Sequence, residues 1–158
     1  MEKKGEAKVK LPPIDQIGIV VKDAQKTANN YSSIFGIGPF TIQEFDMRQD
    51  NVILYSKPAG GKLRIAFAQI GSIEIELIQV LEGGEYYSQF LHNKGEGLHH
   101  LGVRIQDLDS YDRLLTELAG QGIKPVMSRR DRKSAFAYLD TQAIGGVILE
   151  LIYAEKGA

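Results

Sequence analysis

The sequence predicts an α+β protein in which one βαβββ unit occurs twice, and two observations support this. Residues 15–23 (DQIGIVVKD) align with residues 99–107 (HHLGVRIQD), so each half begins with a similar strand that carries a glycine and leads to an aspartate. Each half also closes with a similar apolar strand, IELI at 75–78 and LELI at 149–152. A single unit of this kind cannot bury both faces of its small sheet. We therefore expect the two units to pack together within one chain or to exchange places with a partner chain.

The first unit should begin with a strand at 14–21, where apolar and β-branched residues are frequent. Asp23 is a suitable N-cap for a helix over 23–35, whose apolar and small residues recur at helical spacing, and residues 36–39 (GIGP) supply the stop. Three strands should follow: 40–47, a stretch within 53–69 that a turn at 58–61 interrupts, and 73–80.

The second unit repeats this order. We expect a strand at 99–105, a helix over 107–121 that stops at Gly122, and strands at 124–128, 135–139 and 147–153. A short helix at 86–93 fits the segment between the units. The chain thus divides into a flexible N-terminal tail (1–13), a first module (14–80), a connector (81–96) and a second module (97–154), which together make one structural domain.

The composition excludes several classes of protein. Of the 158 residues, 43% are hydrophobic and 25% are charged, which suits a globular domain with a normal core. The formal net charge of −1 gives no overall attraction to nucleic acid, whose binding proteins usually have a basic face or stripe. Because the chain has no cysteine, disulfides, thiolate ligands and a cysteine nucleophile are excluded. The sequence contains neither a membrane-spanning apolar run nor a signal-peptide pattern, so we expect a cytoplasmic protein that binds no membrane and no nucleic acid.

Four polar residues stand at matching places in the two units. Gln16 aligns with His100, and the closing strands each place one glutamate, Glu76 or Glu150, between apolar neighbours. If the first and last strands of each unit are neighbours and a pseudo-twofold axis relates the units, these four side chains meet at one centre. One imidazole, two carboxylates and one amide oxygen make a ligand set that suits Zn²⁺, Ni²⁺, Co²⁺ or Mn²⁺.

Each of these residues, taken singly, has an ordinary structural explanation. A glutamate in a strand commonly lies on a solvated edge, and a lone glutamine carries little information. The shared register of the two units is what favours a metal centre. His99 aligns with Asp15 and is expected either to support the site or to belong to the core.

Three stretches carry a family resemblance: IDQIGIVV at 14–21, GLHHLGV at 97–103 and GGVILEL at 145–151. They resemble the vicinal oxygen chelate superfamily, which includes glyoxalase I, methylmalonyl-CoA epimerase, extradiol dioxygenases and bleomycin-resistance proteins, and they look most like the epimerases. The resemblance covers nearly the whole chain after residue 13. It implies that the modules form a curved, mixed, eight-stranded sheet, in which the superfamily's ligand positions are occupied by Gln16, Glu76, His100 and Glu150.

The sequence departs from the epimerase pattern at two places. The epimerases usually have histidine where this chain has Gln16, and a Gln/Glu/His/Glu set is similar to that of zinc-dependent glyoxalase I. The resemblance also implies a further carboxylate on a middle strand of the first module, but the matching stretch at 62–67 (KLRIAF) has none. An epimerase with this sequence would therefore use Glu76 and Glu150 as its two acid–base groups.

The resemblance implies a metal-dependent epimerase that acts on methylmalonyl-CoA or a similar 2-substituted acyl thioester. Glu150 would remove the α-proton and Glu76 would return it, while a divalent metal ion stabilises the enolate. Two alternatives are a glyoxalase I-like lyase that acts on a thiol hemithioacetal and a non-catalytic ligand-binding protein of the bleomycin-resistance kind. An Fe²⁺ extradiol dioxygenase fits less well, because that chemistry uses two histidine ligands and one carboxylate, whereas the four candidate ligands include only one histidine.

A basic run near the end of the chain is a candidate for substrate binding. Arg129, Arg130 and Arg132 would receive the phosphates of CoA, although a charged hairpin tip is also a common surface feature. We expect a small acyl-CoA or thiol-adduct substrate and a homodimeric protein.

Overall fold

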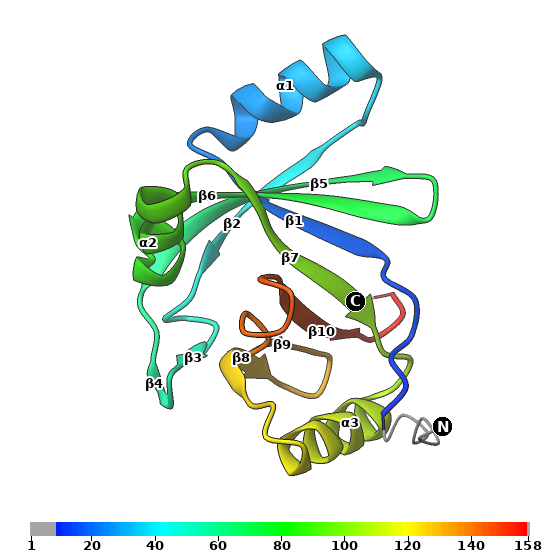
Figure 1. Cartoon of the computed structure of the whole chain (residues 1–158). Helices are drawn as coiled ribbons and strands as arrows, with labels where there is room; N and C mark the ends of the chain where they lie inside the picture. Colours follow the sequence, from blue (N-terminus) through cyan, green and yellow to red (C-terminus); the bar gives the residue numbers. More distant parts are fainter. Residues whose placement is uncertain (1–8, 158) are drawn as a thin grey trace, which may run out of the picture.

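The computed structural model describes residues 9–157, whose ten strands form one strongly curled sheet with three helices around it (Figure 1). The elements are, in chain order, β1 (Gln16–Val20), α1 (Ala24–Phe35), β2 (Thr41–Asp46), β3 (Ile53–Leu54), β4 (Lys57–Pro58), β5 (Gly61–Ile70), β6 (Ile73–Gly83), α2 (Glu85–Lys94), β7 (Gly97–Arg104), α3 (Leu108–Gly120), β8 (Pro125–Arg130), β9 (Ser134–Leu139) and β10 (Ile148–Ala154). The predicted α+β class and curved mixed sheet are confirmed. Residues 1–8 of the predicted tail lie outside the described residues.

The two halves of the chain join through an antiparallel pair of strands at the middle of the sheet. β1 pairs with β7, while β1 lies parallel to β6 and β7 lies parallel to β10. The first and last strands of each half are therefore neighbours, as a shared centre requires. The full strand order is β2-β5-β6-β1-β7-β10-β9-β8-β3-β4.

The sheet has ten strands, and the expectation of eight is wrong in this respect. The stretch within 53–69 is a small hairpin, β3 and β4, followed by the long strand β5. In the hairpin, Tyr55 and Ser56 adopt the left-handed conformation at the turn. β3 pairs with β8 of the other half, where Ile53 lies opposite Ser128. This pairing joins strands that are about 75 residues apart in the sequence, so no local pattern announces it.

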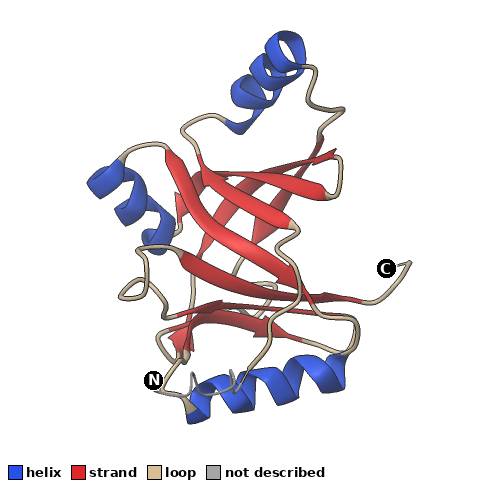
Figure 2. Cartoon of the chain, turned by 45° about the vertical axis from the view of Figure 1, so that its right-hand side comes forward, coloured by secondary structure: helices blue, strands red, loops and turns tan. Residues whose placement is uncertain are grey.

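The two long helices begin and end where the sequence predicts. Asp23 caps α1 by accepting a hydrogen bond from the backbone N–H of Lys26, and Asp107 caps α3 in the same way through Ser110. α1 ends at Gly36, whose φ of 67° favours glycine. Both helices lie on the outside of the curled sheet, one against each half (Figure 2). Among the described residues, no helix is long and apolar enough to cross a membrane.

The interior of the curl is apolar at one end. α2 covers this end (Figure 1), and Tyr87 of α2 packs there against side chains from both halves and from the hairpin region. The buried members of this core are Val20, Met47, Val52, Ala59, Leu63, Ile65, Ile78, Tyr87, Met127, Tyr138 and Ile148. Buried polar side chains on β1, β6, β7 and β10 form the candidate site.

Candidate metal centre

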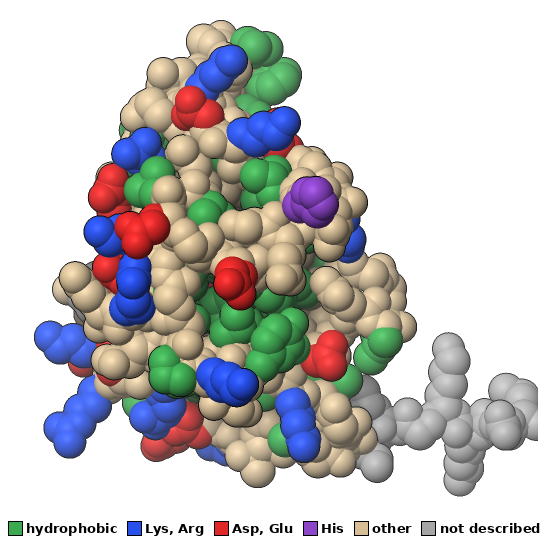
Figure 3. Space-filling view, turned by 90° about the vertical axis from the view of Figure 1, so that its left-hand side faces the viewer, with side chains coloured by type: hydrophobic (Ala, Val, Ile, Leu, Met, Phe, Trp, Pro, Cys, Tyr) green, Lys and Arg blue, Asp and Glu red, His purple; other side chains and the backbone are tan. Residues whose placement is uncertain are grey.

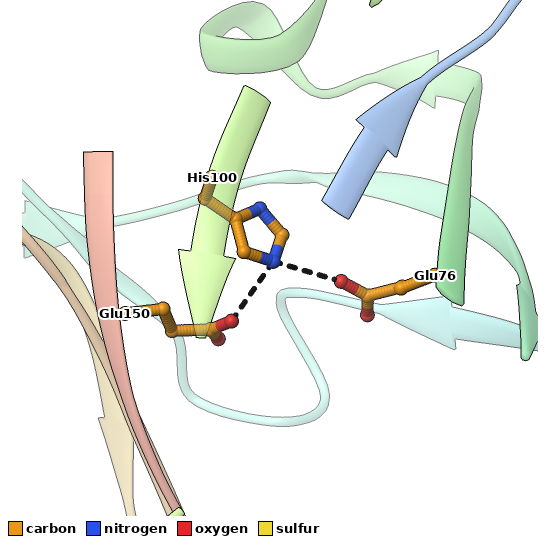
Figure 4. Close-up of side chains that lie close together, drawn as sticks. All are labelled: Glu76, His100 and Glu150. Carbon is orange, nitrogen blue, oxygen red and sulfur yellow. Dashed lines mark ion pairs between the residues drawn. The ribbon is translucent and has the colours of Figure 1, made fainter. Parts of the chain in front are cut away.

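The four predicted ligands converge on one point of the concave face. His100 Nε2 lies 3.1 Å from Gln16 Oε1, 3.1 Å from Glu76 Oε2 and 3.0 Å from Glu150 Oε2. Figure 4 shows the two carboxylates, one from β6 and one from β10, converging on this imidazole nitrogen. All four residues are buried, and a single chain supplies them all.

The strand register explains this convergence. Glu76, Gly18 and His100 form one row across β6, β1 and β7, because Gly18 pairs with both of the others. Gln16 and Glu150 form a second row with Gly102 between them, across β1, β7 and β10. A glycine thus stands at the middle of each row.

These glycines make room for the ligands. A Cβ at Gly18 would overlap the imidazole ring of His100, and a Cβ at Gly102 would lie 2.9 Å from both Cβ and Oε1 of Gln16. The two ligands on β1 and β7 can therefore lie over the neighbouring strand because it has no side chain there. The repeated glycine in the two aligned segments follows from this arrangement.

A β-bulge on β7 turns His99 to the same side as His100. The register shifts between Gly18 and Ile19, which pair with His100 and Leu98, so His99 is the additional residue. The two Nδ1 atoms lie 3.1 Å apart. Burial, followed by the nearby charge of His100, lowers the pKa of His99 to about 3, so its neutral ring accepts a hydrogen bond from His100. The second imidazole nitrogen, Nε2, then faces the carboxylates.

The contacts among these four side chains do not satisfy all of their polar atoms, whereas a divalent cation would. Oε2 of Glu76 and Oε2 of Glu150 have no hydrogen-bond partner beyond their ion pairs with the same imidazole nitrogen. That nitrogen carries at most one proton, yet three oxygens surround it. A cation at this point would satisfy both carboxylates, the amide oxygen and the imidazole together. One nitrogen and three oxygens fit Zn²⁺, Ni²⁺, Co²⁺ or Mn²⁺.

A cavity of about 470 Å³ connects these groups to the surface. Gln16, Glu76 and Glu150 lie among its walls, together with the aromatic rings of Phe67 and Phe136. The remaining lining residues are Gln43, Glu74, Arg104, Arg129, Ser134, Ala135, Ile152, Tyr153 and Ala154. A small substrate can therefore reach the candidate metal centre from solvent through this cavity.

The three predicted substrate-binding arginines lie in different surroundings. Arg129 lines the cavity. Arg130, the next residue along β8, forms two hydrogen bonds to the carboxylate of Asp112 on α3. Arg132 is exposed in the turn between β8 and β9. Only Arg129 of the three lies among the residues around the candidate ligands.

No role was predicted for Glu74, which contacts the candidate ligand Gln16, or for Arg104, which contacts Glu74. Nε2 of Gln16 donates a hydrogen bond to Glu74 Oε1 over 2.9 Å, and Arg104 Nη2 donates to the same oxygen over 2.6 Å. Glu74 lies two residues before Glu76, so strand alternation alone places it on the same face. Arg104 has no comparable signal, because it aligns with Val20 in the first half.

The fold and the site define a known class of protein. Residues 15–138 match the Glyoxalase/Bleomycin resistance protein/Dioxygenase superfamily, and the chain belongs to it. The chain is 28% identical over 138 residues to the uncharacterized protein YqjC of Bacillus subtilis (strain 168), a match that covers 87% of this chain and 89% of that protein.

Solved structures of methylmalonyl-CoA epimerases have the same fold. The enzyme from Mycobacterium tuberculosis is 23% identical with a TM-score of 0.67, and the match covers 89% of this chain and 87% of that one. A variant of the Streptomyces coelicolor enzyme in complex with 2-nitronate-propionyl-CoA is 21% identical with a TM-score of 0.69, and the match covers 93% of this chain and 97% of that one. The resemblance predicted from the sequence is confirmed at the level of superfamily and fold.

Metal binding is expected to release about one proton per ion at about pH 8. Burial lowers the pKa of His100, but the charges and hydrogen bonds of Glu150 and Glu76 outweigh it and raise this pKa to about 10. The imidazole of the metal-free protein therefore carries a proton that the cation has to displace. Calorimetric titration with Zn²⁺ in two buffers of different ionisation enthalpy measures this release. A binding heat independent of the buffer would contradict the expectation.

The same pKa predicts how the metal-free protein responds to pH. Because the pKa of His100 in the folded protein is raised from 6.5 to about 10, the stabilisation from its charge is complete below about pH 6.5 and is lost as the pH rises through about 10. We expect the free energy of unfolding to decrease across this range, as measured by urea denaturation with a chelator present. Bound metal should remove most of this dependence, since it replaces the proton.

Proposed function

We propose that this protein is a metal-dependent epimerase of methylmalonyl-CoA or of a similar 2-substituted acyl thioester. The observation that carries the proposal is the convergence of Glu76 and Glu150, two buried carboxylates from different modules, on His100 Nε2 beside an open cavity. Inversion of a carbon centre requires one group to remove a proton from one side and another to return a proton on the other side. The similarity to methylmalonyl-CoA epimerases supports the choice of substrate.

The side chains of the site would have different roles in the reaction. A divalent cation held by Gln16, Glu76, His100 and Glu150 would supply stabilisation of the negative charge that develops on the substrate oxygen. In the absence of the cation, burial raises the pKa of the Glu150 carboxyl, although His100 partly opposes this. Phe67 is the strand neighbour of Glu76 and lines the same cavity.

Proton exchange in D₂O tests the proposed reaction. The purified protein is loaded with Co²⁺ and mixed with methylmalonyl-CoA, and NMR follows the loss of the α-proton signal. Exchange well above the rate of a metal-free control supports the proposal. Background exchange by a protein that holds stoichiometric metal would contradict it.

The ligand set favours a second candidate reaction. Gln16 provides an amide oxygen where the epimerases usually have histidine, and a Gln/Glu/His/Glu set is similar to that of zinc-dependent glyoxalase I. A glyoxalase I-like lyase would convert the hemithioacetal of glutathione in the presence of Zn²⁺, which an absorbance assay detects. If neither substrate reacts and the protein holds no stoichiometric ion, the non-catalytic binding function remains.

The arginines of β8 provide a test of substrate binding. Three N–H groups of Arg129 donate to the backbone carbonyl of Asp50, to Ser134 and to Asp131, so two further N–H groups can bind a phosphate or carboxylate. We expect Arg129→Met to raise KM for the acyl-CoA by about tenfold, as the loss of a hydrogen bond to a charged group does. Arg130→Met should change KM much less, because Arg130 faces α3. Equal effects on KM would contradict a role specific to Arg129.

The prediction of a homodimer is part of this proposal. Ile34 and Phe35 at the end of α1 are large apolar side chains that are 68% and 66% exposed in the single chain. Such side chains are common at subunit interfaces. Sedimentation equilibrium measures the mass in solution, and a monomer at micromolar concentration would contradict the prediction.

A further inference from the structure

Gln16 differs from the other three candidate ligands because its side chain has two chemically different ends. A carboxylate presents an oxygen to a cation whichever way it turns, whereas an amide presents either its oxygen or its NH₂ group. Only the oxygen can bind a metal ion. A useful ligand at position 16 therefore requires something that fixes the orientation of the amide.

Glu74 supplies this constraint. Nε2 of Gln16 donates to Glu74 Oε1 over 2.9 Å, while Oε1 of Gln16 faces the centre, 3.1 Å from His100 Nε2. Arg104 donates to the same oxygen of Glu74 over 2.6 Å and forms an ion pair with this carboxylate. An ionised carboxylate accepts hydrogen bonds and donates none. The reversed amide would place one oxygen against another, so the observed orientation is strongly preferred.

The strand partner of the candidate ligand is polar in the first half of the protein and apolar in the second. The pseudo-twofold axis relates Gln16 to His100, and in the sheet Gln16 pairs with Glu74 while His100 pairs with Ile148. The imidazole has its own orienting contact, from Nδ1 to His99, and an apolar neighbour is sufficient beside it. A polar partner is present in the half that carries an amide.

We propose that Glu74, held in place by Arg104, is a positioning residue that turns the amide oxygen of Gln16 toward the metal ion. Arg104 belongs to β7 and Glu74 to β6, so the contact also links the two modules beside the site. The inference rests on the metal centre of the proposed function and is independent of the reaction catalysed there.

Metal affinity of a Glu74→Gln variant tests the proposal without any substrate. The glutamine is nearly isosteric but uncharged, so Arg104 holds it less firmly, and it can turn either its oxygen or its NH₂ group toward Gln16. We expect the affinity for Co²⁺, measured by competition with a chelator, to fall by about 10- to 100-fold. The visible spectrum of bound Co²⁺ should change as the amide oxygen is lost. Glu44→Gln is the matched control, because Glu44 pairs with Arg64 of the neighbouring strand at the surface and lies outside the cavity lining.

A double-mutant cycle separates positioning from a general effect of the lost charge. In a Gln16→Ala background no amide remains to be oriented, and Glu74→Gln should then change the affinity by no more than about twofold. Thermal unfolding of each variant confirms that it is folded. Arg104→Met, which releases Glu74, is a second route to the same test and should weaken binding only when Gln16 is present.

Three results would overturn the proposal. The first is an unchanged affinity in Glu74→Gln, and the second is an equal loss with and without Gln16, which would indicate that charge alone matters. The third is a wild-type protein that binds no divalent ion, which would also remove the metal centre on which the proposed function depends. The first two results leave that function intact, so the two failures can be told apart.

Discussion

Glu150→Gln is expected to lower the rate of α-proton exchange by about 10²- to 10⁴-fold for the epimer of methylmalonyl-CoA whose α-proton faces Glu150. The substitution removes the proton-accepting group and keeps an amide oxygen, which is the type of ligand that Gln16 offers at the same centre. The loss should therefore appear in proton transfer more than in metal content. NMR in D₂O with each epimer separately, together with metal analysis, measures both quantities.

Glu76→Gln is the complementary variant, because it removes the other proposed acid–base group. Glu76 reaches His100 Nε2 from the other module, so this variant should lose exchange of the other epimer and keep that of the first. Both variants should lose interconversion of the epimers, because inversion needs both carboxylates. Loss of exchange for both epimers in Glu150→Gln alone, with metal retained, would indicate a single base and contradict the division of work between the two glutamates.

Gly18→Ala is expected to weaken metal binding by at least about 10- to 100-fold, even though residue 18 offers no ligand atom. The added Cβ would overlap the imidazole of His100, which has to leave its position between the carboxylates. The ring is fully buried and has little space in which to move. We also expect the free energy of unfolding to fall by about 1–3 kcal/mol, as is usual when a methyl group is forced into a packed interior.

Gly120→Ala is the control for this substitution. Gly120 lies at the end of α3, and a Cβ there meets nothing within 4 Å. The same chemical change should leave metal affinity as it is, measured by the same chelator competition. If Gly18→Ala binds metal as tightly as the wild type, then the strand backbone moves aside and the repeated glycine has a different explanation.

The surface near α2 has a second cavity, which is separate from the candidate metal centre. Figure 3 shows a face with apolar side chains in its centre and charges of both signs around them. A second cavity of about 680 Å³ lies near the β3–β4 hairpin and the start of α2, with Tyr86 and Met127 in its walls. None of the four candidate ligands lines it, so its larger volume is no reason to place the reaction there.

The helices and most strands could be predicted because their signals are local. Asp23 and Asp107 cap helices through the backbone a few residues away, and Gly36 ends α1 by its own left-handed conformation. The hairpin of β3 and β4 could not be predicted in this way. Its turn residues, Tyr55 and Ser56, both adopt a left-handed conformation that is uncommon for these residue types, and β3 of the hairpin pairs with β8 from the other half.

The candidate ligands could be found in the sequence because the chain contains the same unit twice. Aligned positions of a repeat take equivalent places in the fold, so Gln16 and His100, and likewise Glu76 and Glu150, pointed to one centre before any contact was known. The glycines in the same alignment were visible as a pattern. Their role as space for the neighbouring ligand was not, because it depends on which strand lies beside which.

The orientation of the ligands was decided only by the tertiary structure. Glu74 meets Gln16 because β6 and β1 are neighbours, and Arg104 reaches Glu74 because β7 lies on the other side of β1. Periodicity, capping and repeats are properties of short segments, and they determine the elements and the four candidate positions. Contacts across strands depend on the pairing of segments that are 30 to 80 residues apart, and a bulge of one residue, such as that at His99, changes which side chain faces the site.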